Sequence, residues 1–365
     1  MEKSKKKLAL VIHNLQGGGM ERVMSMLLQN FAARKESVEL HLILYGITRE
    51  VFYDIPSSVI IHRPDFSFNN SWRLWSTLKT LSFLRNKIQS LKPDSILSFG
   101  ERWNNMVLLS GLGLNWPIYV SDRCQPDKSL GKMQDMLRNW LYPQAKGIVA
   151  QTDQAKGIFQ KMYHHTNIQV IGNPIKQVNP QIIENRENII LSVGRLIDSK
   201  HHLELIQLFA KLNSQVWKLV IVGGDALRQT NLEKLTGLIN NLGVQDRVEL
   251  VGAVKDVESW YRKSRIFAFP SSSEGFPNVV GEALAHGLPV IAFDCVAGPR
   301  DLIQHGKNGF LIETLDFEDF AKHLHQLMTD DDLLKTMAEN APNSVLSFCE
   351  EEIAHRFYQG ITNHH

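Results

Sequence analysis

Short apolar runs alternate with longer amphipathic stretches along the whole chain. The runs are almost continuously hydrophobic, which is typical of strands buried on both faces of a parallel sheet. Because such strands alternate with helical patterns, the chain is predicted to be an α/β protein with doubly wound sheets. The predicted strands are residues 8–12, 38–44, 59–61, 95–99, 117–120 and 147–150, followed by 188–193, 217–222, 247–251, 265–269 and 289–293.

A polar segment with two Asn-Pro pairs interrupts this alternation near the middle of the chain. It predicts a linker at residues 173–187 between two Rossmann-like domains, residues 1–172 and 188–345. Parallel sheets bind ligands at the carboxyl ends of their strands, so we expect the two domains to face each other across a cleft. Residues 346–365 include a helical pattern with one apolar face, which we expect to pack back toward the first domain.

Composition fits a soluble protein with large cores, since 43% of the 365 residues are hydrophobic and 21% are charged. No apolar stretch approaches the roughly 20 residues that a membrane span needs, and the first 15 residues lack the features of a signal peptide. The three cysteines are scattered, which indicates a reducing compartment without a disulfide framework or metal cluster. We therefore expect a cytoplasmic protein.

Charge is divided unevenly between the two halves. Residues 1–175 carry 22 Lys and Arg against 13 Asp and Glu, a net charge of +9, and residues 176–365 carry 18 against 25, a net charge of −7. The basic half is expected to face something anionic. No pattern in the chain predicts nucleic-acid binding.

The segment SSSEGFPNVVGEALAHGLPVIAF, residues 271–293, places two carboxylates, Glu274 and Glu282, on either side of a turn. Pro277 suits the first turn of a helix, which is predicted over 279–285. Backbone amides near Gly275 and Phe276 would then point out of the helix N-terminus and favour a phosphate. Carboxylates beside a phosphate site make sense if they accept hydrogen bonds from hydroxyls, and a nucleotide sugar has that combination.

A second motif, SVGRLIDSKHHLELI at residues 192–206, brings Arg195 and Lys200 to the end of a predicted strand. These two cations suit a diphosphate, Arg195 through its planar fork and Lys200 as a point charge. With no acidic cluster to bind Mg²⁺, they are expected to carry the charge that a metal carries elsewhere, so the reaction is predicted to need no metal and no cofactor beyond the nucleotide-sugar co-substrate.

The wording EGFPNVVGEALAHGLPVIAFD, with Glu-x₇-Glu, resembles glycosyltransferase family 4, retaining enzymes of the GT-B architecture. The segment that follows resembles members that add N-acetylhexosamine-type sugars to bacterial cell-surface or lipid-linked glycans. The resemblance implies that Glu282 binds the ribose and that Glu274 contacts the transferred sugar. It also implies that Arg195 and Lys200 hold the diphosphate of a UDP-sugar. The remaining donor contacts would come from Gly275, Phe276, Pro277 and Asn278.

Two glycine loops resemble further family signatures. Gly18 and Gly19 lie in GGGMER, which resembles a loop that sits against donor phosphates and acceptor, where the missing Cβ permits a close approach. Gly223 and Gly224 follow a predicted strand, and by the resemblance they form the base pocket together with backbone near Val254. GGGMER lacks the G-x-G-x-x-G spacing of a dinucleotide site, which argues against a dehydrogenase.

The loop SDRCQPDKS, residues 121–129, departs from the family, many of whose members have a histidine there near the sugar. Asp122 and Arg123 occupy that neighbourhood. We expect both to lie near the sugar or acceptor, and Arg123 could contact a phosphate.

The stretch 69–92 combines an apolar stripe with Arg73, Lys79, Arg85 and Lys87, and no acidic residue occurs between Asp65 and Asp94. Two interpretations are open: a helix that covers the sheet, or a helix whose basic face and two tryptophans rest on anionic lipid. Together with the basic half, this stretch predicts a protein peripheral to the inner face of the cell membrane, acting on a glycan or polyprenyl-diphosphate-linked acceptor.

Two classes of function remain as alternatives to a retaining glycosyltransferase, one enzymatic and one not. A nucleotide-sugar epimerase or a glycosyl phosphorylase could use the same architecture, but the first needs acid and base residues around the sugar and the second a cofactor lysine. A non-catalytic nucleotide-sugar-binding partner of another transferase would not need Arg195, Lys200, Glu274 and Glu282 together. Neither alternative explains these four residues as well.

Overall fold

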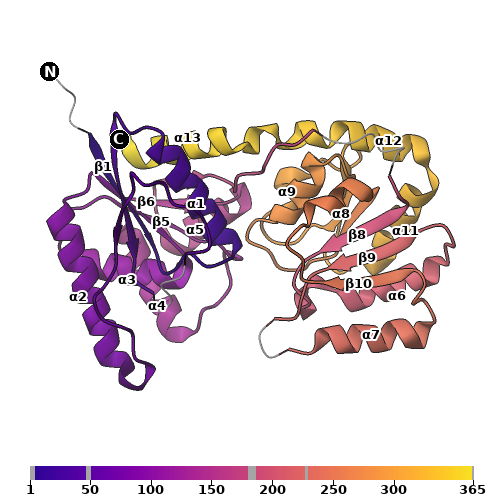
Figure 1. The fold of residues 1–365 in the computed structure, drawn as a ribbon, viewed down its shortest axis with the longest axis horizontal. Coiled ribbons are helices and arrows are strands. Elements are labelled where there is room, and N and C mark those ends of the chain that lie inside the picture. The colour runs from indigo at the N-terminus through magenta and orange to yellow at the C-terminus, as the bar shows by residue number, and fades with distance from the viewer. Residues whose placement is uncertain (1–4, 47–50, 180–185, 227–228, 364–365) are drawn as a thin grey trace. The chain divides into compact units, whose positions relative to one another are not determined.

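The computed structural model describes residues 5–46, 51–179, 186–226 and 229–363. Two compact units make up the chain, unit 1 with Met1–Pro174 and Glu350–His365, and unit 2 with Ile175–Cys349. Each unit is a parallel sheet with helices on both faces (Figure 1). The predicted α/β fold with two doubly wound, Rossmann-like domains is confirmed.

Unit 1 contains a seven-stranded sheet in the order β3-β2-β1-β4-β5-β6-β7. Its strands are β1 (Lys6–Ile12), β2 (Val38–Leu44), β3 (Ile60–His62), β4 (Ser95–Phe99), β5 (Ile118–Ser121), β6 (Gly147–Ala150) and β7 (Ile168–Val170). Its helices are α1 (Gly19–Ala32), η1 (Asn70–Trp72), α2 (Arg73–Leu91), α3 (Glu101–Gly111), α4 (Lys132–Leu141), η2 (Tyr142–Gln144), α5 (Asp153–Tyr163) and α13 (Glu350–Thr362).

The sheet of unit 1 is buried from both sides, which explains its unbroken apolar strands. One face packs against α2, α3, α4 and α5, with Leu84, Val107 and Phe159 in the shared core. Helix α1 contacts β1 and β2, and α13 contacts β4 and α1. The last helix of the chain is thus part of unit 1, where Phe31 and Tyr358 stack edge to face with ring centroids 5.7 Å apart.

Unit 2 contains a six-stranded sheet in the order β10-β9-β8-β11-β12-β13. Its strands are β8 (Ile189–Val193), β9 (Lys218–Val222), β10 (Val248–Gly252), β11 (Ile266–Phe269), β12 (Val290–Phe293) and β13 (Gly309–Ile312). Its helices are η4 (Asp198–Lys200), α6 (His202–Leu212), α7 (Asn231–Leu242), α8 (Glu258–Lys263), α9 (Asn278–Ala285), α10 (Pro299–Leu302), α11 (Phe317–Thr329), α12 (Asp331–Asn340) and η5 (Pro342–Phe348).

Alternate residues of the strands in unit 2 enter different cores. Ile190 joins a core with α6, α7, α11 and α12, whereas Leu191 joins a core with α8, α9 and η5. Both are fully buried. This two-sided burial again accounts for the continuous apolar pattern of the strands.

Part of the segment expected to be a linker is packed into unit 2. Ile175 is buried in the core beneath α9, and its amide donates to the carbonyl of Phe348 at 2.7 Å. The guanidinium of Arg186 is buried and donates to the carbonyl of His286 at 2.6 Å. The chain therefore enters unit 2 at Ile175, whereas the sequence pattern placed this start at 188. Residues 180–185 lie outside the described part.

Every predicted strand is present, and β7 and β13 were missed. These two strands have three and four residues and lie at edges of their sheets. A run that short gives no distinct hydrophobic period.

Candidate active site

The loop after β11 brings Lys200 and Glu274 together. Nζ of Lys200 donates to Oε1 of Glu274 at 2.5 Å, and the hydroxyl of Ser271 donates to the same oxygen at 2.6 Å. Both charged side chains are 14% exposed. Lys200 also lies over the ring of Phe269, 4.5 Å from its centroid. Two motifs 74 residues apart thus meet in one partly buried ion pair.

The loop between β8 and α6 is tied to the same place through its backbone. The amide of Ser272 donates to the carbonyl of Ser199 at 2.9 Å, and the hydroxyl oxygen of Ser271 lies 3.2 Å from the same carbonyl oxygen. Because these bonds fix the loop, Lys200 reaches Glu274 with little freedom. Arg195, five residues earlier, is exposed, and its side chain has no partner among the described residues. It remains available to a ligand.

Helix α9 starts directly after this pair. It runs over Asn278–Ala285 with Pro277 at its N-cap, one residue earlier than the predicted start. Within the described residues, the amides of Gly275 and Phe276 make no hydrogen bond. Free amides at a helix N-terminus favour an anion. Phe276 itself is buried and anchors the loop against Phe348, with ring centroids 5.6 Å apart.

Glu282 lies in the second turn of α9 and is held by Tyr261. The hydroxyl of the buried Tyr261 donates to Oε2 of Glu282 at 3.1 Å. The ring of Tyr261 stacks on His286, with centroids 5.1 Å apart and planes 28° apart. Burial lowers the pKa of His286, which favours its neutral form beside the tyrosine. Sequence reasoning assigned no role to Tyr261, because its contact with Glu282 joins two separate helices, α8 and α9.

Glycines join the loops after β8 and β9. Gly223 has φ +157°, and a Cβ built on it would lie 1.8 Å from the carbonyl oxygen of Gly194. The amide of Leu196 donates to the carbonyl of Gly224 at 2.9 Å. No side chain fits at Gly223 without moving the backbone that leads to Arg195. The glycines predicted to form the base pocket therefore also position the loop that carries Arg195, which is predicted to bind the diphosphate.

Val254 lies in the loop after β10 and is half-buried against the core of α8 and α9. Gly252, just before it, has φ +76°, a conformation that glycine adopts readily. The amide of Gly223 donates to the carbonyl of Gly252 at 2.9 Å, so the loops after β9 and β10 are adjacent. All predicted donor residues of unit 2 thus follow strand ends of one sheet edge, where parallel sheets bind ligands.

Cys295 lies near this edge, and its thiol is buried. Burial, with the nearby charge of Glu274, raises the pKa of its thiol to about 12. A thiol with so high a pKa is a poor nucleophile near neutral pH. Cys295 is therefore a packing residue of this edge.

In unit 1, Gly18 forms the N-cap of α1, with Gly19 as the first residue of the helix. The hydroxyl of Tyr53 donates to the carbonyl of Gly18 at 2.9 Å. A Cβ on Gly18 would lie 2.3 Å from a carboxylate oxygen of Glu21, so the turn leaves no room for a side chain unless Glu21 moves. The loop is open on its other side, since Gly19 is exposed.

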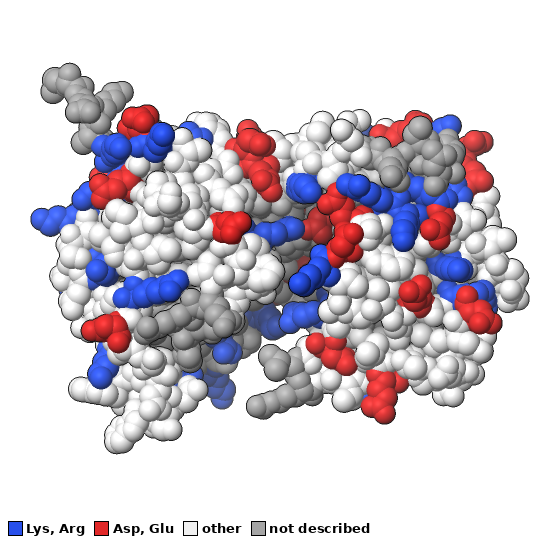
Figure 2. Space-filling view, in the orientation of Figure 1, with Lys and Arg blue, Asp and Glu red and all other residues white. Residues whose placement is uncertain are grey.

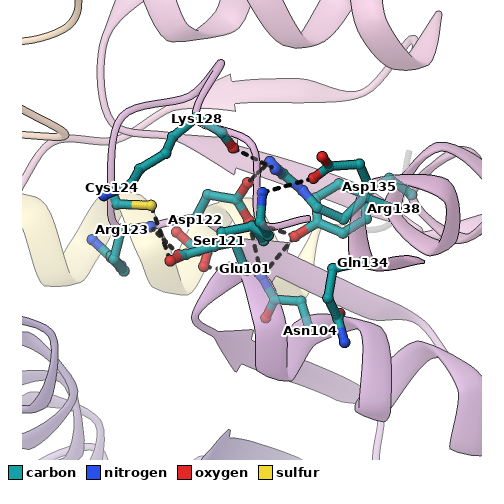
Figure 3. Close-up of polar contacts among 12 residues, drawn as sticks. Glu101, Asn104, Ser121, Asp122, Arg123, Cys124, Lys128, Gln134, Asp135 and Arg138 are labelled. Atoms are coloured by element: carbon teal, nitrogen blue, oxygen red, sulfur yellow. Dashed lines mark hydrogen bonds and ion pairs between the residues drawn. The ribbon is translucent and has the colours of Figure 1, made fainter. Parts of the chain in front are cut away.

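Asp122 is a buried structural carboxylate, at the centre of the cluster in Figure 3. It accepts from Arg138 at 2.7 Å, from the hydroxyl of Tyr142 at 2.5 Å and from Asn104 at 3.1 Å. Burial raises the pKa of Asp122, and the charge of Arg138 opposes that effect. These contacts occupy both carboxylate oxygens, so the carboxylate of Asp122 serves the fold, and its expected place near the sugar or acceptor stays a prediction.

Arg123 turns into unit 1 and stacks on an aromatic ring. Its guanidinium carbon lies 3.7 Å from the ring centroid of Phe99 and 5.5 Å from that of Phe357. One nitrogen donates to Asn173 at 2.7 Å. Burial lowers the pKa of Arg123 to about 9. Its backbone amide and the thiol of Cys124 both donate to Glu101, at 3.3 and 2.9 Å, which orders the start of the loop (Figure 3).

Sequence reasoning missed an aromatic group at the carboxyl edge of the unit 1 sheet. The ring of His13, after β1, stacks on Trp103 with centroids 3.7 Å apart and planes 11° apart. Tyr45, after β2, meets both rings edge to face. Burial lowers the pKa of His13 to about 4, so it is neutral at pH 7. The signal was present in the sequence only as three aromatic or imidazole residues after separate strands.

The described residues offer neither a metal-binding cluster nor a membrane-spanning helix. They contain no group of three or more His, Cys, Asp and Glu side chains placed to hold a metal ion. None of their helices has both the length and the hydropathy to cross a bilayer.

Comparison with known proteins connects this arrangement to glycosyl transfer. Residues 175–344 match the family model of glycosyl transferases group 1. The amylovoran biosynthesis glycosyltransferase AmsD of Erwinia amylovora is 28% identical over 92% of this chain and 93% of its own length. An N-acetylgalactosaminyltransferase of Campylobacter jejuni, named for a diphospho-undecaprenol substrate, is 28% identical over 95% of this chain and 97% of its own.

Solved structures establish the fold over the whole chain. Anabaena HepE, solved in complex with UDP, matches with a TM-score of 0.79 at 18% identity, covering 97% of this chain and 98% of HepE. Two parallel-sheet domains with such neighbours define the GT-B fold, as the sequence predicted.

Proposed function

We propose that this chain, whose residues 175–344 match the family model of glycosyl transferases group 1, is a glycosyltransferase that moves a sugar from a UDP-sugar to an acceptor hydroxyl with retention of anomeric configuration. The acceptor is a glycan or a polyprenyl-diphosphate-linked glycan, and the sugar is an N-acetylhexosamine. The observation that carries the proposal is the Lys200–Glu274 pair at the start of α9, beside two unpaired amides.

The groups at this edge match the parts of a nucleotide sugar. The free amides of Gly275 and Phe276 and the exposed Arg195 suit a diphosphate. Glu282, oriented by Tyr261, suits the ribose diol, and Glu274 suits sugar hydroxyls. HepE, of the same fold, has been solved with UDP, which supports uridine as the nucleoside of the donor.

The reaction we propose forms one bond and breaks one bond at the anomeric carbon. The acceptor oxygen attacks from the face on which the diphosphate departs, and the leaving phosphate oxygen takes the acceptor proton. Arg195, Lys200 and the two amides stabilise the negative charge that grows on the diphosphate. These residues supply the compensating positive charge themselves, so we propose a metal-independent enzyme with no cofactor.

A lipid-linked acceptor is supported by two lines of reasoning. The Campylobacter relative is named for transfer to a diphospho-undecaprenol-linked glycan. Unit 1 also contains most of the basic half of the chain, with a net charge of +9 over residues 1–175. We therefore place the protein at the cytoplasmic face of the membrane as a peripheral enzyme.

The test is incubation of the purified chain with UDP-, GDP- and dTDP-sugars, each with and without a lipid-linked acceptor. We expect slow release of UDP from one UDP-N-acetylhexosamine, accelerated by acceptor. The sugar in the product should keep the anomeric configuration of the donor, as read from its proton coupling by NMR. Inversion, or release from GDP-sugars alone, contradicts the proposal.

A further inference from the structure

Helix α2 exposes large apolar side chains at its beginning. Trp72, just before the helix, is 71% exposed, and Leu74, Trp75 and Leu78 are 77%, 60% and 49% exposed. Deeper in the helix, Leu84 and Ile88 are fully buried. One end of the helix therefore packs in the core, whereas the other presents tryptophan and leucine to solvent. Clustered exposed residues of this size mark an interaction surface.

The same helix lines a polar groove. The groove has a volume of about 590 Å³ and lies between α2 and the segment that follows β3. The residues that α2 contributes share one face of the helix. Trp75, one turn before Lys79, lies on the same face nearer the N-terminus of the helix. The lining residues are Arg63, Asp65, Phe66, Lys79, Ser82, Phe83, Asn86, Lys87 and Ser90.

The groove is cationic. It contains Arg63, Lys79 and Lys87 against one carboxylate, Asp65, and in the described part of the chain none of the three cations has an ion pair or hydrogen bond. Burial and the charge of Lys87 lower the pKa of the neighbouring His62 to about 4, so this imidazole adds no charge at pH 7. Unpaired cations with hydroxyl and amide donors form a suitable site for a phosphate.

Arg85 differs from these cations, although the sequence grouped it with them. Its guanidinium donates to the carbonyls of Ser110 and Leu112, at 3.1 and 2.7 Å, and so caps the end of α3. It is therefore a structural residue. At the lower left of Figure 2, a few blue and red side chains stand among white ones, and the lowest tip is white.

We propose that α2 is the membrane-binding element, with the groove holding the phosphate of an anionic phospholipid while Trp72, Leu74, Trp75 and Leu78 enter the bilayer interface. Tryptophan prefers that interface, and cations near an anionic surface strengthen attachment. The inference deepens the proposed function, because a lipid-linked acceptor requires the enzyme to reach a membrane. The test of membrane binding uses no nucleotide sugar, so this inference and the proposed function can fail separately.

The experiment is flotation of the full chain with vesicles of phosphatidylcholine, alone or mixed with phosphatidylglycerol, at low and high salt. Three double variants are compared: Lys79→Gln with Lys87→Gln in the groove, Leu74→Ser with Trp75→Ser at the apolar end, and Lys35→Gln with Lys161→Gln as a control. The control removes the same charge from exposed sites elsewhere on unit 1. Thermal unfolding midpoints verify that each variant folds.

We expect the wild type to float with phosphatidylglycerol vesicles and to be released by salt. Each α2 variant should bind roughly tenfold or more weakly, whereas the control stays within about twofold of the wild type. Glycerol 3-phosphate should compete if the groove recognises the headgroup phosphate.

Three results overturn the inference. Equal losses in the groove and control variants mean diffuse charge attraction with no specific groove. Unchanged binding in the apolar variant removes the insertion of α2. Failure of the wild type to float with either vesicle removes the membrane as the partner and leaves a protein surface as the occupant to test.

Discussion

Lys200 and Glu274 form a partly buried ion pair, with Nζ 2.5 Å from Oε1, across two loops at the carboxyl edge of the unit 2 sheet. The pair fixes the cation proposed for the diphosphate against the carboxylate proposed for the sugar. Glu274 also accepts from Ser271, so the carboxylate is held from two sides. Preorganised groups of this kind stabilise a transition state without reorganisation during the reaction.

The two carboxylates of the α9 region should differ in what they bind. Glu282→Ala should weaken the binding of UDP alone, because the ribose is present in free UDP. Glu274→Ala should leave UDP binding nearly unchanged and weaken the intact donor or its turnover. Calorimetric titration with UDP, then with the UDP-sugar, separates the roles. Loss of UDP binding in Glu274→Ala, with normal binding in Glu282→Ala, would show that the assignment is reversed.

Tyr261 should act through Glu282. Tyr261→Phe removes the hydroxyl that orients the carboxylate but keeps the ring stacked on His286. A hydrogen bond to a carboxylate contributes about 1.5–3 kcal/mol, so UDP should bind roughly tenfold or more weakly. In a Glu282→Ala background the same change should have little further effect. If the two losses add in full, Tyr261 does not work through Glu282.

Asp122 should matter for stability. Asp122→Ala leaves Arg138 buried without its partner, and breaking a buried pair costs about 3–5 kcal/mol. Asp127→Ala, in the same loop but exposed, should change the free energy of unfolding by less than about 0.5 kcal/mol. Urea unfolding of both variants makes the comparison. If the Asp122→Ala protein is as stable as the wild type and has lost only turnover, then Asp122 acts in the acceptor site and not in stability.

The sequence predicted the strands of both units and the motifs at one sheet edge, since buried strands and glycine-rich loops leave local signals. It could not orient loop side chains. Asp122 points inward because Arg138 and Tyr142, on later elements, supply its partners. Arg85 was assigned to a surface for the same reason, since the carbonyls that it caps belong to another helix. Such contacts depend on packing between distant segments, which periodicity does not encode.

Removal of metal ions should leave turnover intact. Under the account above, Arg195, Lys200 and the amides before α9 supply the positive charge that the departing diphosphate needs. Assays after EDTA treatment and desalting should therefore give rates within about twofold of untreated protein. Loss of activity that Mg²⁺ or Mn²⁺ restores would establish a metal requirement.

Turnover of Lys200→Ala and Arg195→Ala at saturating donor tests the central claim most directly, namely that this edge of unit 2 holds the departing diphosphate. Removing one group that stabilises developing charge commonly costs about 10²–10³ in kcat. We expect a loss of that size in each variant, with a much smaller change in KM for the donor. Lys211→Ala, which changes an exposed lysine at the end of α6, serves as the matched control and should behave like the wild type. If both variants turn over at close to the wild-type rate, the diphosphate does not bind at this edge and the account is contradicted.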